Sequence, residues 1–166
     1  MIACPGGDFC SLANARSLPI AEAITERYQD LDELWDLGEI DLHISGCINS
    51  CGHHHSGHIG ILGVDKDGKE WYQVTLGGSD GSDLSGTAVA GKVIGPSFAL
   101  NEVVGVVEQL LETYVDLRHE DERFIDTVRR IGVEPFKTRV YAERSARREA
   151  EEAFFRSLDE RTGEVP

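Results

Sequence analysis

Four cysteines in two glycine-rich segments constrain this chain more than any other feature of its sequence. Cys4 and Cys10 form a C-x5-C pair within "ACPGGDFC", and Cys47 and Cys51 form a C-x3-C pair within "SGCINSCG". The glycine and proline around the pairs predict tight loops, because glycine adopts backbone conformations that other residues avoid. If the four thiols serve one site, the fold must bring together two loops that residues 11–46 separate along the chain.

Several kinds of chemistry use four cysteines, and the surrounding residues favour one of them. Buried free thiols do not suit glycine and proline turns, and two disulfides need an oxidising compartment that nothing in the sequence indicates. Structural zinc favours about two to four residues between paired ligands, and a single catalytic thiol leaves three cysteines unexplained. An iron–sulfur cluster needs four thiolates from separate backbone segments. The spacing therefore favours a 4Fe–4S cluster over these alternatives, which it does not by itself eliminate.

Length and charge limit what the chain binds. Its 166 residues, 40% of them hydrophobic, match one soluble globular domain. A net charge of −14 argues against DNA or RNA as a partner, because phosphate binding needs clustered cations. No apolar run approaches the roughly 20 residues of a membrane span, and no secretory signal is visible. We therefore expect a cytoplasmic protein that binds no nucleic acid and no membrane.

Hydrophobic periodicity predicts the elements of the first half. We expect a short helix over residues 9–16, and a second one from Pro19, a favoured first helical position, to about residue 30. The segment 39–45, "EIDLHIS", alternates apolar and polar residues, which is typical of a strand with His43 on its polar face. Two further strands, within 58–64 and 70–78, flank "DKDG", whose Asp-Gly chemistry predicts a tight turn.

Helices are predicted for the second half. Apolar residues recur at i, i+3, i+4 and i+7 from Val103 to Tyr114, behind Asn101 as the expected helix cap. A shorter helix is expected from Asp121 to a stop at Gly132. The charged segment 144–161 is also expected to be helical, either as an exposed helix or as a tail that needs a partner. These patterns predict one α/β unit with a helical tail.

Three stretches of the chain carry a resemblance to a known family. "ACPGGDFCSLANARS", "SGCINSCGHHHSGHIGILG" and "YQVTLGG" together resemble the C-terminal part of the assimilatory sulfite and nitrite reductase hemoproteins. The likeness extends from Ile2 to about Tyr141, where "RIGVEPFKTRVY" is also similar to the family. It implies an α/β (α+β) fold, with a mixed β-sheet flanked by helices in a 4Fe–4S/siroheme domain over residues 1–141. A charged helical tail would then occupy residues 142–166.

The resemblance also implies a set of site residues. The four cysteines would ligate a 4Fe–4S cluster, and Cys51 would also bridge to the iron of a siroheme. Close to these cofactors the family motif places an asparagine between the ligands and a glycine pair after a strand, which here are Asn49, Gly77 and Gly78. The glycine-rich segment 76–86 lacks the Gly-Lys-Ser/Thr ending of a phosphate-binding loop. No catalytic residue is assigned.

A run of histidines, His53, His54, His55 and His58, follows the last cysteine. With Cys51 available as the haem-bridging ligand, an axial histidine is unnecessary. The histidines would then fill polar space around the loop or face the solvent. Alternatively, one or two of them, His54 among them, would bind siroheme carboxylates or relay protons.

The implied activity is the six-electron reduction of sulfite to sulfide or of nitrite to ammonia. Family hemoproteins are several times longer, and the basic residues that grip the oxyanion come largely from their N-terminal segments. The only cations among the first 100 residues here are Arg16, Arg27, Lys66, Lys69 and Lys92. We therefore expect a C-terminal portion that needs the missing N-terminal half and an electron donor, either a flavoprotein subunit or a ferredoxin.

Two other functions remain as alternatives. The chain would be a stand-alone 4Fe–4S electron-transfer protein, although its cysteine spacing differs from that of bacterial ferredoxins. Or it would be an inactive, metal-free fragment. An absorption spectrum distinguishes the three cases, because they predict siroheme bands, a broad cluster shoulder alone, or no visible absorption.

Overall fold

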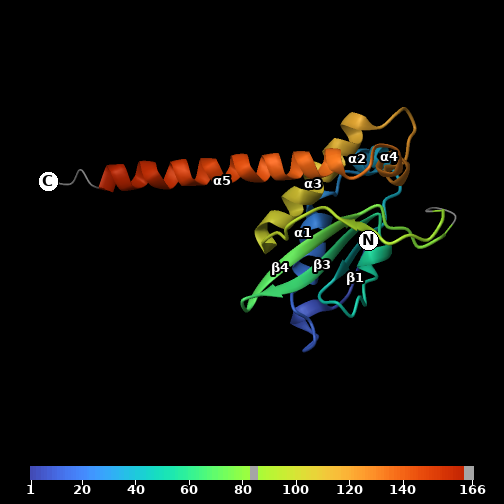
Figure 1. Ribbon diagram of the computed structural model, residues 1–166, viewed down its shortest axis with the longest axis horizontal. Coiled ribbons are helices and arrows are strands. Elements are labelled where there is room, and N and C mark those ends of the chain that lie inside the picture. The colour runs from blue at the N-terminus through green and yellow to red at the C-terminus, as the bar shows by residue number, and fades with distance from the viewer. Residues whose placement is uncertain (83–85, 163–166) are drawn as a thin grey trace.

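A mixed five-stranded sheet forms the centre of the protein. The computed structural model, which describes residues 1–82 and 86–162, orders the strands as β1 (Ile2–Ala3), β2 (Leu42–Ser45), β3 (Ile59–Lys66), β4 (Lys69–Leu76) and β5 (Lys92–Val93). Strands β1, β2 and β3 run parallel, whereas β3–β4 and β4–β5 are antiparallel pairs. In the view of Figure 1, α1 lies behind the strands and α3 crosses above them. The expected α/β fold with a mixed sheet is confirmed.

Helices account for most of the remaining structure. The α-helices are α1 (Leu18–Arg27), α2 (Leu31–Leu37), α3 (Val103–Leu117), α4 (Phe124–Ile131) and α5 (Glu134–Thr162). Three short 3-10 helices are η1 (Gly6–Asp8), η2 (His54–Ser56) and η3 (Leu100–Glu102). One apolar core joins the helices to the sheet, with fully buried side chains that include Tyr72, Phe98, Leu110, Phe124 and Phe136.

The β3–β4 hairpin forms as the sequence predicted. Its register runs from Ile59 opposite Leu76 to Lys66 opposite Lys69. Asp67 and Gly68 make the turn with φ angles of 55° and 72°. Positive φ at both central residues matches the right-handed twist of the strands, which explains the Asp-Gly sequence. Local chemistry is sufficient to define this element.

The strand β2 is buried on both faces, whereas its alternating sequence predicted one apolar and one polar face. It is shorter than the segment 39–45, and all four of its residues are buried. His43 is only 6% exposed, so the expectation that it lies on a polar, solvent-facing side is wrong. The reason is the position of β2 between two parallel neighbours, because such strands are usually covered on both faces.

The predicted helix over residues 9–16 is absent, and that expectation is wrong. After η1 the chain makes turns instead, with the N–H of Cys10 donating to the carbonyl of Gly6 and the N–H of Ala13 donating to that of Cys10. These turns carry Asn14 and Ala15 to the carbonyl of Gly46, at 2.9 and 3.0 Å. A continuous helix would not bring both N–H groups to one distant acceptor.

The helices of the chain begin and end close to, but not always at, their predicted residues. The second predicted helix corresponds to α1 and ends at Arg27, and α2 was not predicted. Asp30 caps α2 by accepting hydrogen bonds from the N–H groups of Asp32 and Glu33. Asn101 does not cap α3, because residues 100–102 form η3 and Glu102 is the capping residue. The helix expected from Asp121 begins at Phe124 and stops at Gly132 as predicted.

The helix α5 extends far beyond the rest of the protein. Figure 1 shows it passing over α3 and then projecting away from the body towards the C-terminus. It is continuous from Glu134 to Thr162, so the helical character of the charged segment 144–161 is confirmed, whereas the domain division at residue 141 stays a prediction. Residues 83–85 of the glycine-rich segment and 163–166 of the tail lie outside the described residues. None of the helices in the described part of the chain is long and apolar enough to cross a membrane.

Candidate iron–sulfur site

The parallel pairing of β1 and β2 brings the two cysteine segments together. Cys4 directly follows β1, and Cys47 follows β2 after Gly46. Because Ala3 lies opposite Ile44 in a parallel register, both strands end at the same edge of the sheet. The N–H of Cys4 donates to the carbonyl of Ile44 at 3.0 Å, which extends the pairing by one residue. The loops therefore leave the sheet side by side.

Hydrogen bonds then join the two loops directly. The N–H of Gly46 donates to Cys4 Sγ at 3.1 Å, and the carbonyl of Gly46 accepts from Asn14 and Ala15. Ser17, which is fully buried, donates from its hydroxyl to the carbonyl of Cys4, and its Oγ lies 3.6 Å from Cys4 Sγ. Hydrogen bonds from backbone N–H groups to cysteine sulfur are among the features by which proteins tune iron–sulfur clusters. The sequence analysis identified neither Gly46 nor Ser17, since only the fold places them beside Cys4.

All four cysteines are free thiols, with different degrees of exposure. Cys47 is buried, Cys4 and Cys10 are half-buried, and Cys51 is exposed. Among residues 1–82 and 86–162, no three His, Cys, Asp or Glu side chains gather closely enough to hold a single metal ion. A 4Fe–4S cluster does not require that arrangement, because each of its cysteines binds a different iron. Four free thiols on two joined loops fit the ligand set of such a cluster.

Two residues beside Cys51 have an uncommon backbone conformation. Ser50 and His53 have φ angles of 60° and 54°, in the left-handed region that non-glycine residues seldom adopt. Successive turns, in which the N–H groups of Ser50 and His53 donate to the carbonyls of Cys47 and Ser50, hold this geometry. They leave Asn49 and Cys51 exposed on the outside of the loop.

The histidine run divides into buried and exposed side chains. His53 and His55 are exposed, whereas His54 is 8% exposed. The hydroxyl of Ser50 lies 3.0 Å from His54 Nδ1 and 2.8 Å from His55 Nδ1, and so links the run to the cysteine loop. Burial lowers the pKa of His54 below its ordinary value, and the neighbouring charge of His55 lowers it further. The neutral form of His54 is therefore favoured.

His58 is completely buried behind this loop. The N–H of Asp41 donates to His58 Nδ1 at 3.2 Å, so that nitrogen is an acceptor and a neutral ring carries its proton on Nε2. Nε2 lies 3.9 Å from Asp41 Oδ2. Burial lowers the pKa of His58, although the Asp41 carboxylate acts in the opposite direction. His58 thus serves as a neutral hydrogen-bonding group in the core.

The glycine pair after β4 packs against the histidine loop. A Cβ atom on Gly78 would lie 2.5 Å from the carbonyl oxygens of Gly57 and His55, so no larger residue fits there. Gly77 has a φ of 79°, which favours glycine, and its N–H donates to the carbonyl of His58 at 3.0 Å. The pair therefore holds the loop that follows Cys51 in place.

The architecture and the loops define a class: an α/β domain that presents cysteine-bearing loops at one edge of its sheet. Comparison with known proteins gives the family. The chain belongs to the nitrite and sulphite reductase 4Fe–4S domain family, whose model matches residues 1–148. The family and its hemoprotein relatives imply a 4Fe–4S cluster and a siroheme as cofactors.

Relatives with described functions are much longer than this chain. The sulfite reductase [NADPH] hemoprotein beta-component of Bacillus licheniformis is 32% identical over 135 residues, which are 80% of this chain and 22% of that protein. The assimilatory ferredoxin-dependent nitrite reductase of Haloferax mediterranei is 28% identical over 131 residues, 74% of this chain and 21% of that protein. The chain thus spans about a fifth of the length of these relatives.

Solved structures support the fold. The Mycobacterium tuberculosis NirA protein is similar with a TM-score of 0.65 and 28% identity, over 81% of this chain and 26% of NirA. Dissimilatory sulfite reductase I is similar with a TM-score of 0.69 over 83% of this chain and 51% of that chain. Its identity of 16% makes this second likeness one of fold alone.

Proposed function

We propose that this chain is the cluster-bearing C-terminal portion of a sulfite or nitrite reductase that depends on siroheme and a 4Fe–4S cluster. Cys4, Cys10, Cys47 and Cys51 would hold the cluster, and Cys51 would also hold the siroheme. The observation that carries the proposal is the hydrogen bond from the Gly46 N–H to Cys4 Sγ, because it joins the two cysteine loops at one edge of the sheet.

When bound, the cluster and siroheme supply stepwise electron transfer to the substrate. The residues of this chain hold and shape the site. Gly46 directs its N–H at Cys4 Sγ, and Ser17 holds the carbonyl of the same cysteine. Asn49 is exposed between Cys47 and Cys51, and Gly78 packs against the histidine loop. In this proposal both residues shape the cofactor surroundings. His54 is suited to donate a hydrogen bond as a neutral ring.

The substrate-binding cations are expected to come from a partner portion of the enzyme. Three large apolar side chains on the cysteine loops, Phe9, Leu12 and Ile48, are 78%, 69% and 83% exposed. Large apolar side chains that are exposed on adjacent loops favour contact with another protein surface over water. An N-terminal portion of the hemoprotein would cover them, and the electron donor would be a flavoprotein subunit or a ferredoxin.

The test is anaerobic reconstitution of the chain with iron and sulfide, followed by absorption spectroscopy and iron and sulfide counts. We expect a broad visible cluster band and the iron content of one cluster per chain. Cys4→Ser and Cys51→Ser should each lower that content, whereas Ser11→Ala, an exposed change beside Cys10, should not. Unchanged iron in both cysteine variants would contradict the ligand assignment.

A second experiment tests the role of Cys51 in the complete enzyme. With the N-terminal part and siroheme supplied, Cys51→Ser should abolish the magnetic coupling between haem and cluster in electron paramagnetic resonance, while Cys4→Ser should weaken the cluster without removing the bridge. His54→Ala should have a smaller effect than either. Coupling that survives in Cys51→Ser but disappears in His54→Ala would move the bridging role to the histidine. Robust sulfite or nitrite reduction by the 166 residues alone would refute the need for a partner portion.

A further inference from the structure

The face of α5 that packs on the body continues where the body ends. Phe136 and Val140 are buried on this face, and Arg144 follows at the same spacing. The next positions at three- and four-residue intervals are Arg147, Glu151, Phe154 and Leu158, which helical geometry places on the same side. Phe154 is 57% exposed and Leu158 is 37% exposed, beside Phe155 at 63%. Beyond a charged stretch, apolar side chains therefore recur on this side of α5 where the body no longer covers it.

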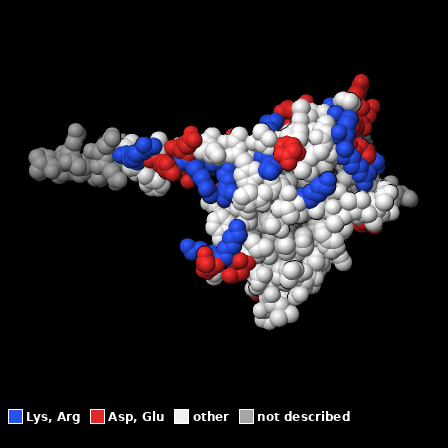
Figure 2. All heavy atoms as spheres, viewed as in Figure 1, with Lys and Arg blue, Asp and Glu red and all other residues white. Residues whose placement is uncertain are grey.

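A groove lies beside this face where α5 leaves the body. It has a volume of about 250 Å³ and runs between α5, the start of β4 and the turn before η3. Its wall is formed by one aromatic, two neutral, two acidic and three basic residues: Trp71, Ala99, Asn101, Glu102, Glu151, Arg144, Arg147 and Arg148. In Figure 2, basic side chains gather at this junction, on the side turned towards the β3–β4 hairpin. Lys66 on that hairpin adds a cation, with its Nζ 5.5 Å from the Trp71 ring centre.

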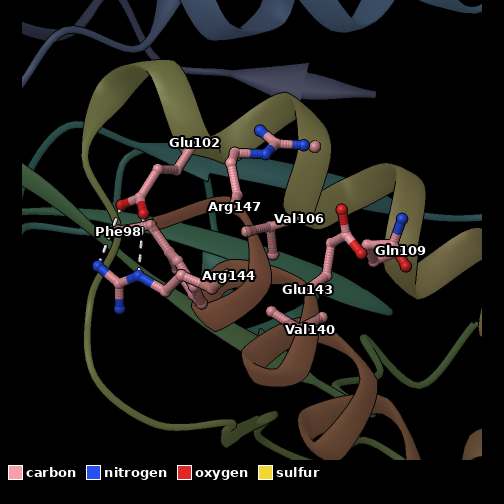
Figure 3. Close-up of a pocket in the computed structure, with 9 residues that line it drawn as sticks. Phe98, Glu102, Val106, Gln109, Val140, Glu143, Arg144 and Arg147 are labelled. Atoms are coloured by element: carbon pink, nitrogen blue, oxygen red, sulfur yellow. Dashed lines mark hydrogen bonds and ion pairs between the residues drawn. The ribbon is translucent and has the colours of Figure 1, made fainter. Parts of the chain in front are cut away.

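The carboxylate of Glu102 is already engaged by other groups. It binds Arg144 at 2.9 and 3.0 Å and accepts the N–H of Ala99 at 2.7 Å. Arg148 lies 3.9 Å from the same carboxylate and is 59% exposed. Figure 3 shows Arg147 standing apart from the Arg144–Glu102 pair. Its guanidinium lies over Gly105, about 3.4 Å from where a Cβ would be, and makes no hydrogen bond or ion pair within residues 1–82 and 86–162.

Three arginines against two glutamates line the groove, and this local excess of positive charge is unusual for the chain. Its net charge is −14, and other arginines such as Arg118, Arg130 and Arg139 each lie within 3.0 Å of a carboxylate. Planar guanidinium groups bind carboxylates through paired hydrogen bonds, and their contribution grows when the contact excludes water. The groove therefore offers guanidinium N–H groups that can donate hydrogen bonds to carboxylates. Exposed aromatic and aliphatic side chains lie next to these groups.

We propose that this groove and the adjoining stripe of Phe154, Phe155 and Leu158 form a docking surface for an acidic, apolar-bearing segment of a partner protein. Carboxylates of that segment bind Arg147 and Arg148, while its apolar side chains cover the stripe. A second copy of this chain fits less well, because a two-fold contact centred on the groove would bring the same guanidinium groups together. At 0.1 M salt, screening confines electrostatic interactions to about 10 Å, so carboxylates farther than this from the groove oppose binding little.

Trp71 in the groove wall can report binding through its fluorescence, because it is one of only two tryptophans in the chain. Trp35→Phe removes the other, which is 89% exposed on α2. In that background, Trp71 emission is followed during titration with a short peptide of alternating glutamate and leucine, and with a matched lysine–leucine peptide. The titrations compare Arg147→Glu/Arg148→Glu with Lys92→Glu/Lys137→Glu, which makes the same charge change outside both the groove and the stripe. A second variant, Arg147→Gln/Arg148→Gln, removes both positive charges without adding negative ones. Its circular dichroism spectrum tests whether any loss of binding comes from misfolding.

We expect saturable binding of the acidic peptide, weakened at least ten-fold by either groove variant and by high salt, and retained in the control. The lysine–leucine peptide should not bind. Equal binding of both peptides, or equal loss in the control variant, would overturn the proposal. Sedimentation equilibrium adds one more outcome: a dimer that dissociates only in the groove variants would make the groove an interface between copies, and the acidic partner would be rejected.

Discussion

Replacing Gly46 with alanine tests whether close contact between the loops builds the candidate site. A Cβ at this position would lie 2.6 Å from the carbonyl oxygen of Ala15 and 2.9 Å from the Cα of Gly6. Both are backbone atoms of the loop that carries Cys4 and Cys10, so no side-chain rotation relieves the clash. The two loops must separate, which also lengthens the hydrogen bonds that Gly46 makes.

The expected cost follows from those contacts. Overpacking by a single carbon costs about 1–3 kcal/mol. The displaced loop would also weaken at least one of three hydrogen bonds, from Gly46 to Cys4 Sγ and from Asn14 and Ala15 to Gly46, each contributing about 0.5–1.5 kcal/mol. We therefore expect a total loss of about 2–4 kcal/mol in the free energy of unfolding. For a chain of this size, that corresponds to a melting temperature lower by about 4–16 °C.

Thermal unfolding of the metal-free chain, followed by circular dichroism, measures the stability. Iron and sulfide counts after reconstitution measure the site. The matched control is Gly7→Ala in the same loop, where a Cβ would meet its nearest atoms at 3.4 Å, an ordinary contact distance. A Gly46→Ala chain that melts with the control and assembles a full cluster would refute the inference that the site depends on this loop contact.

Three smaller predictions concern residues that support the loops. Because burial lowers the pKa of His58 below its ordinary 6.5, unfolding takes up a proton as the pH falls through 6.5. The free energy of unfolding should therefore decrease below that pH, and His58→Gln should flatten the decrease in pH-dependent urea titrations. The Tyr72 hydroxyl contacts the Arg16 carbonyl at 2.8 Å and Glu70 Oε2 at 2.7 Å, so Tyr72→Phe should cost about 1–3 kcal/mol in urea unfolding. Gly78→Ala should shift the histidine ring signals in NMR spectra, because its Cβ would strike two carbonyls of their loop.

Local patterns predicted those elements whose stability is mostly local. The β3–β4 hairpin follows from alternating residues around Asp67 and Gly68, and α3 from its 3.6-residue apolar period. Residues 9–16 show the limit of this reasoning. Their composition permits a helix, but the hydrogen bonds of Asn14 and Ala15 to Gly46 favour turns. A contact across the fold outweighs a weak helical preference, since propensity differences are fractions of a kcal/mol per residue.

The burial of His43 likewise depended on tertiary structure. Alternation with apolar neighbours predicted an exposed face, but β2 lies between two parallel strands and both of its faces are covered. The ring finds a partner in the carbonyl of His53, 3.0 Å from its Nδ1. The residues of segment 39–45 do not by themselves determine which strands will lie on either side of it.

The sequence by itself determined the chemistry available at the candidate site: four thiols in two glycine-rich loops, with a spacing that favours a 4Fe–4S cluster. Only the tertiary structure decided that the loops meet, since this depends on the parallel register of β1 and β2 and on the missing side chain at Gly46. The same holds for the docking groove, where arginines of α5 lie beside a tryptophan of β4. Residue types are local properties, whereas proximity between distant segments arises from the packing of the whole chain.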